Sequence, residues 1–358
     1  MGKLEDIQQH LENIKSLEGD SFAYDEQAIL REYEKRGGEK SNFIIKVLSI
    51  FGGILASIAF LGFLFILRLY DSQMGILLVG IGLVIVSIFL TKKFDSIIIS
   101  TIGISLFMLG LVLFVLGLSS FDINEDVITL LVIAVALCSL FVVHNPILSF
   151  FAFLVISGGI LILIFFNDTY SLIHVYINLH ALALTYIFLN ESSVLTSNFK
   201  LVKLYDPLRI ALVFSLLFGL VATSKNGLFS MSKSYYWCSS LVLILILMYV
   251  VYRLLKEFKV ESSQTKLWVY LFSALILLPT LFAPAISGAL LVVLLSFKVN
   301  YKTGLSIGIL ALIYFVIQYY YDLNYTLLTK SIILFFSGLV FLLFYVFISK
   351  KLKSNEKV

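Results

Sequence analysis

The feature that most constrains this chain is a series of long apolar segments with almost no charged residues. One of them, residues 97–117, reads IIISTIGISLFMLGLVLFVLG. A helix of about 20 such residues crosses the ~30 Å hydrocarbon core of a bilayer with every backbone polar group paired. With 60% hydrophobic and 13% charged residues, the chain lacks the polar surface of a soluble domain. We therefore predict an all-α polytopic transmembrane helix bundle, and we exclude a soluble enzyme.

The apolar pattern predicts about twelve spans joined mostly by short connections. They are residues 43–67, 74–91, 97–117, 127–144, 146–166, 170–189, 207–224, 235–255, 267–282, 284–297, 304–320 and 326–349. The stretch 267–297 fits either two short spans or a re-entrant pair, and the second choice leaves ten full spans. The predicted membrane domain, residues 43–349, is preceded by residues 1–42 and followed by a basic tail, residues 350–358.

Residues 1–42 form the one predicted appendage, and they are acidic. They hold ten of the 22 acidic residues of the chain. Leu4, Ile7, Leu11 and Ile14 recur at the spacing of one helix face, and a second helix is expected to follow and to end at a Gly-Gly pair. We expect a short cytoplasmic helical hairpin that either packs on the membrane domain or binds a protein partner.

Positive charge predicts the orientation of the chain. With the N-terminus inside, all but four of the 26 Lys and Arg residues fall on the cytoplasmic side. The four outside are Arg68, Lys225, Lys233 and Lys330. This asymmetry predicts an even number of crossings and places both termini in the cytoplasm.

The sequence carries no motif for a known chemistry. It contains no CxxC, no HExxH and no cluster of Cys and His, so we predict no catalytic residue, no metal and no cofactor. The acidic residues after residue 42 fall at span ends or in turns, so no carboxylate is placed at mid-membrane for ion coupling. The lipid bilayer is the partner that the composition requires, and no nucleic acid partner is expected.

Two polar regions interrupt the apolar spans, and the first lies in residues 170–189. Helical spacing puts His174 and Asn178 on one stripe of this span and Tyr176 and His180 on another, with His180 near the middle of the membrane. These side chains either line a cavity or fix helix packing through hydrogen bonds between helices.

The second polar region contains Pro279, Thr280, Pro284 and Ser287. Its two prolines break any continuous helix. A broken helix at membrane depth marks a binding site in many transporters, and the alternative is a tight turn at the outer face. A carrier with its site between two halves of the chain predicts that this region and the span 170–189 border a common cavity.

The six-plus-six arrangement of spans invites comparison with the major facilitator transporters. The loop after the second span, TKKFDS, lacks the glycine, the Asp-Arg pair and the arginine cluster of that family. The segment KVLSIFGGILA at residues 46–56, which follows the acidic N-terminal helices, instead resembles a set of bacterial predicted membrane proteins known only as domains of unknown function. The resemblance implies a bacterial inner-membrane location and supplies no activity.

Three classes of function fit the sequence. The leading hypothesis is a transporter, or flippase-like carrier, of a small or amphiphilic solute, because nearly all of the chain lies within the bilayer. The second is a structural or scaffold subunit of a bacterial envelope complex that docks through residues 1–42. The third is an intramembrane enzyme, for which His174, Asn178 and His180 are the only candidate group.

Overall fold

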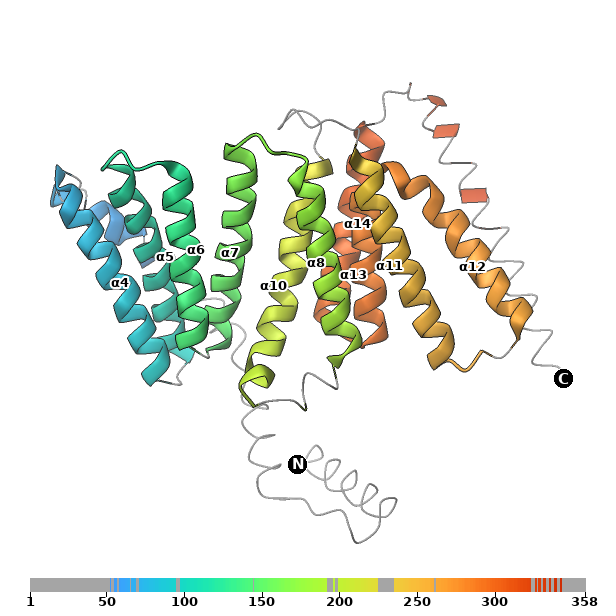
Figure 1. The fold of residues 1–358 in the computed structure, drawn as a ribbon, viewed down its shortest axis with the longest axis horizontal. Helices are drawn as coiled ribbons and strands as arrows, with labels where there is room; N and C mark the ends of the chain where they lie inside the picture. Colours follow the sequence, from blue (N-terminus) through green and yellow to red (C-terminus); the bar gives the residue numbers. More distant parts are fainter. Residues whose placement is uncertain are drawn as a thin grey trace, which may run out of the picture. The chain divides into compact units, whose positions relative to one another are not determined.

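The computed structural model describes residues 71–94, 97–143, 145–191, 199–224, 235–260 and 262–322, together with residue 196 and scattered residues within 52–68 and 326–342. All regular secondary structure in these residues is helical (Figure 1), which confirms the all-α class. The helical hairpin predicted in residues 1–42, much of the spans 43–67 and 326–349, and the basic tail lie outside the described residues.

The chain divides into two compact units, Met1–Asp122 and Ile123–Val358. The first contains α4 (Gln73–Lys93) and α5 (Ile97–Ser119), which pack closely along much of their length. Gly80 permits this approach, because a Cβ atom there would lie 2.6 Å from the backbone nitrogen of Phe114. The hydroxyl of Ser87 on α4 also donates a hydrogen bond of 2.6 Å to the carbonyl of Gly103 on α5.

The second unit holds the remaining described helices. These are α6 (Glu125–Val142), α7 (Pro146–Phe166), α8 (Leu172–Leu189), α10 (Phe199–Ser224), α11 (Tyr236–Glu257), α12 (Ser263–Leu277), the 3-10 helix η3 (Leu278–Phe282), α13 (Pro284–Lys298) and α14 (Lys302–Asp322). In the described part of the chain, nine helices are long and apolar enough to cross a bilayer, and α13 is a shorter apolar helix. The protein is therefore an integral membrane protein of the polytopic class.

Each predicted span between residues 74 and 320 corresponds to a helix, and local signals explain several of the ends. Asn145 caps α7 by accepting hydrogen bonds from the next turn, and Pro146 occupies the first helical position. The exception is α10, which begins at Phe199 rather than at 207 and contains Pro207. A proline inside a helix removes one backbone hydrogen bond and crowds the carbonyl four residues earlier. The helix nevertheless continues through Pro207, so residues 199–206 of the predicted loop 190–206 are helical.

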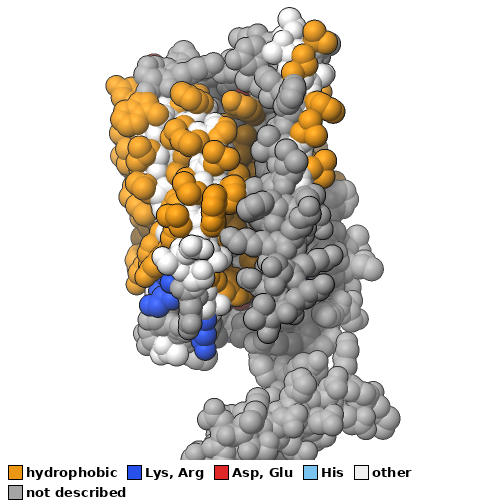
Figure 2. Space-filling model, turned by 90° about the vertical axis from the view of Figure 1, so that its right-hand side faces the viewer, with side chains coloured by type: hydrophobic (Ala, Val, Ile, Leu, Met, Phe, Trp, Pro, Cys, Tyr) orange, Lys and Arg blue, Asp and Glu red, His pale blue; other side chains and the backbone are white. Residues whose placement is uncertain are grey.

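The core of the second unit lies where α8, α10, α11 and α13 pack together. Ile173, Leu216, Leu247 and Leu291, one from each of these helices, are fully buried. In contrast, α12 exposes a stripe of large apolar side chains that includes Leu271, as expected for a helix against lipid. Figure 2 shows apolar side chains over the visible described surface, with Lys and Arg only near its lower end.

Candidate functional site: a groove between α7 and α8

The turn between α7 and α8 positions the first candidate residues. Asp168 adopts a left-handed conformation (φ 51°), and the amide of Thr169 donates back to the carbonyl of Ile164 at 3.1 Å. This pairing ends α7 and turns the chain into α8. The side-chain amide of Asn167 donates to Asp126 of α6 at 2.8 Å, so the turn is also fixed to the start of α6.

The polar side chains of α8 contact three different helices. His174 Nδ1 lies 3.0 Å from the Ser239 hydroxyl of α11, and the Tyr176 hydroxyl donates to the carbonyl of Ser215 of α10 at 3.2 Å. His180 Nε2 lies 3.3 Å from the hydroxyl of Ser157 on α7. Hydrogen bonds between helices of this kind fix packing inside a membrane, as one of the two sequence interpretations expected.

The geometry also determines the tautomer of His180. Its Nδ1 lies 2.9 Å from the backbone carbonyl of Tyr176, which can only accept, so Nδ1 carries a hydrogen. In the neutral ring, Nε2 is then the acceptor for the Ser157 hydroxyl. The imidazole also packs against the Tyr176 ring, with the two ring centres 4.0 Å apart. These contacts hold the side chain in one orientation.

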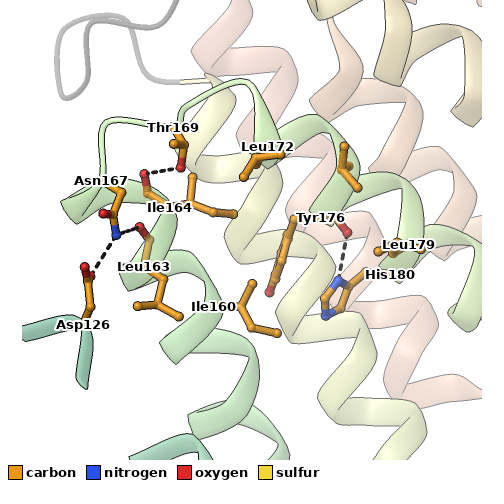
Figure 3. A pocket seen from close by; sticks show the side chains of 11 residues that line it. Asp126, Ile160, Leu163, Ile164, Asn167, Thr169, Leu172, Tyr176, Leu179 and His180 are labelled. Carbon is orange, nitrogen blue, oxygen red and sulfur yellow. Dashed lines mark hydrogen bonds between the residues drawn. The ribbon is translucent and has the colours of Figure 1, made fainter. Parts of the chain in front are cut away.

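Tyr176 and His180 line a groove of about 650 Å³ between α7 and α8 (Figure 3). The two helices are consecutive, yet they touch each other at few points. Most of the wall is apolar, with Ile160 and Leu163 on α7 and Leu179 on α8. The polar groups stand at its two ends, where the Asn167 turn with Asp126 forms one end and Tyr176 with His180 forms the other.

The other candidates of the span 170–189 lie elsewhere. His174 is buried against α11, where its ring also packs on Tyr236 with the ring centres 5.6 Å apart. Asn178 does not line the groove, and its buried Oδ1 has no hydrogen-bond partner among the residues that the structure describes. Helical spacing placed His174 and Asn178 on one face of the helix and Tyr176 and His180 on another. Of these two pairs, only Tyr176 and His180 line the α7–α8 groove.

The proline region forms a turn that is separate from this groove. Pro279 lies in η3 and Pro284 opens α13. The Ser287 hydroxyl donates to the Thr280 hydroxyl at 2.7 Å, and the latter donates to the carbonyl of Leu277 at 2.6 Å, so a chain of hydrogen bonds closes the turn. None of these residues lines the α7–α8 groove, although α8 and α13 pack directly against each other. The structure does not bring the two predicted polar regions together in this groove.

The sequence analysis did not single out Arg209. It was only one of the positive charges counted on the cytoplasmic side of the membrane. Its side chain, on α10, is buried and paired with Glu191 at 3.3 Å and with Asp206 at 2.7 Å. The guanidinium carbon lies 3.8 Å from the centre of the Tyr301 ring. The Asp206 pairing could be expected from its three-residue spacing, whereas Tyr301 comes from the loop between α13 and α14.

Comparison with known proteins adds a family and no activity. Residues 42–351 match the family described as Domain of unknown function (DUF4401). No curated protein and no solved structure matches the chain. Because the match covers most of the chain and includes every helix described above, from α4 to α14, the chain belongs to this family.

Proposed function

We propose that this protein is a transporter, or flippase-like carrier, of an amphiphilic solute, with the α7–α8 groove as the place where the solute binds. The observation that carries the proposal is the groove itself, which has apolar walls and polar ends within a membrane-spanning bundle. A pocket of this kind suits a ligand with an apolar body and a polar group.

The dimensions of the groove support an elongated ligand. Along α8 it extends from Leu172 to His180, a rise of about 12 Å at 1.5 Å per residue. That rise is close to the depth of one leaflet, which is about half of the ~30 Å hydrocarbon core. An alkyl chain fits against the apolar walls, and a polar group would meet either the Asn167 turn or the imidazole of His180.

We place the protein in the inner membrane of a bacterium, with both termini in the cytoplasm. The distribution of Lys and Arg along the sequence supports this orientation. In this arrangement the α7–α8 turn faces the outside, so the groove opens toward the outer leaflet. Residues 1–42 would then form the cytoplasmic appendage.

Photolabelling tests where the solute binds. The protein is reconstituted in vesicles with a diazirine-bearing fatty acid, irradiated, and digested for mapping by mass spectrometry. We expect adducts concentrated on α7 and α8 of the wild type. Leu179→Trp fills the groove and should remove these adducts, whereas Leu271→Trp on the exposed face of α12 should leave them. Adducts spread evenly over the lipid-facing helices would contradict the site.

Transport is tested separately with vesicles that carry a fluorescent phosphatidylethanolamine in both leaflets. Dithionite quenches only the outer leaflet, so a flippase-like protein makes the remaining fluorescence accessible. We expect wild type and Leu271→Trp to do this, and Leu179→Trp to do it slowly. Equal rates in protein-free vesicles and in all three protein samples would refute the carrier proposal and favour the scaffold hypothesis.

A further inference from the structure

A second groove, of about 490 Å³, runs between α8 and α11. Its lining includes Leu182 of α8, Asn190 at the end of that helix, and Val242, Leu245, Tyr249 and Arg253 of α11. Asn190 and Arg253 each lie toward the C-terminal end of their helix. Because the two helices run in the same direction (Figure 1), both residues lie at the same end of the groove. The groove therefore has an apolar length and one end that carries a cation.

The charge of Arg253 is not compensated within the described residues. Its Nε is buried and has no hydrogen-bond partner, and its guanidinium makes no ion pair with any side chain that the structure describes. The two carboxylates that follow α8 and end α11 are paired elsewhere, since Glu191 binds Arg209 and Glu257 binds Lys298 at 2.7 Å. Arg253 therefore differs from Arg209, whose charge is neutralised by two carboxylates.

The surroundings of Arg253 reinforce the positive end. Lys256 and Lys259 follow on the same helix end, and both are exposed. The guanidinium carbon of Arg253 lies 5.9 Å from the centre of the Tyr249 ring, which lines the same groove. An anion at this end would meet the partly exposed guanidinium of Arg253, and phosphate oxygens accept hydrogen bonds from a guanidinium in pairs.

The depth of this groove matches one leaflet. The rise from Val242 to Arg253 is about 16 Å along α11, which is half of the ~30 Å hydrocarbon core. A lipid whose acyl chain lay beside Leu245 and Leu182 would have its headgroup at the level of Arg253. That end is also where the cytoplasmic surface falls in the predicted orientation.

We propose that the α8–α11 groove binds one anionic phospholipid of the membrane, with its phosphate on Arg253 and an acyl chain along the apolar length. Charge complementarity selects the headgroup, and the leaflet-deep apolar groove selects a lipid over a free phosphate ion. This site is distinct from the α7–α8 groove and does not depend on transport.

The test measures lipid binding to the purified protein in detergent by native mass spectrometry, with phosphatidylglycerol and phosphatidylcholine as probes. Wild type should bind phosphatidylglycerol in preference, and millimolar inorganic phosphate should not displace it. Arg253→Gln should weaken phosphatidylglycerol binding about tenfold, which corresponds to about 1.4 kcal/mol. Lys256→Gln, an exposed charge on the same helix end, should weaken it less than about threefold.

Two further variants keep the test decisive. Arg253→Lys preserves the charge and should recover part of the preference, and Leu245→Trp fills the groove and should lower binding of phosphatidylglycerol with Arg253 intact. Elution volume and melting temperature show that each variant is folded. Equal binding of both lipids by wild type, an Arg253→Gln variant with unchanged preference, or displacement by inorganic phosphate would each overturn the proposal.

Discussion

The contact between Arg209 and Tyr301 provides the sharpest energetic test of the packing. Arg209 is 7% exposed, and its guanidinium carbon lies 3.8 Å from the centre of the Tyr301 ring. A cation held over an aromatic face and shielded from water gains about 2 kcal/mol. The Asp206 pairing contributes less, because that carboxylate is 79% exposed and is screened by solvent. We therefore expect the ring to be the larger of the two contributions.

A double-mutant cycle isolates this contribution. Arg209→Met and Tyr301→Leu are made singly and together, and the free energy of unfolding is measured by titration with SDS in mixed micelles. Arg209→Met should cost about 3 kcal/mol, because it also leaves the half-buried Glu191 without its partner. The coupling energy between the two sites should be about 1–2 kcal/mol, and Tyr301→Phe, which keeps the ring, should retain most of it.

The control pairs Arg209→Met with Tyr319→Leu on α14, a tyrosine with no contact to Arg209. These two changes should add to within about 0.5 kcal/mol. A coupling energy below about 0.3 kcal/mol between Arg209 and Tyr301 would refute the reasoning, because the ring would then contribute no more than an aliphatic side chain of similar size.

Three further predictions follow from the orientation, the helix packing and one titratable group. Cysteines at Ser119 and Ser354 should react with impermeant maleimide from opposite sides of spheroplasts, and same-side labelling would contradict the orientation. Gly80→Ala should lower the melting temperature by several degrees because its Cβ meets backbone, while Gly82→Ala, which faces open space, should not. Burial raises the pKa of Tyr301 above 10, although Arg209 opposes the shift. The contribution of the neutral phenol to the free energy of unfolding is therefore complete below pH 10 and is lost as pH rises through the folded-state pKa. Tyr301→Phe should therefore flatten the alkaline fall in melting temperature.

The helices could be predicted from the sequence because the bilayer imposes their length. The span predicted at 146–166 coincides with α7, where Asn145 and Pro146 mark the start unambiguously. The start of α10 could not be placed in the same way. Residues 199–206 include lysines and an aspartate, so they fail a hydropathy criterion even though they continue the helix.

The candidate site could be predicted only in part, because helical spacing gives faces and not neighbours. The sequence separates the face of His180 from that of His174, but it cannot show that the first meets α7 and the second meets α11. The groove exists because α7 and α8, although consecutive, pack mainly against other helices. From the sequence, Arg253 was likewise only one of the positive charges on the cytoplasmic side. Its lack of a carboxylate partner depends on Glu191 and Glu257 being paired with other residues, which the sequence does not show.

The contacts of Arg209 with Glu191, Asp206 and Tyr301 also bear on the order in which the chain can assemble. Both carboxylates bonded to the guanidinium, Glu191 and Asp206, precede Arg209 in the chain and are therefore synthesised before it. The charge can be neutralised as α10 enters the bilayer, where an unpaired arginine is costly. Tyr301 is synthesised only after α11, α12 and α13, so its ring can contact Arg209 only once these helices have been made. The two ion pairs of Arg209 can therefore form before its contact with the Tyr301 ring.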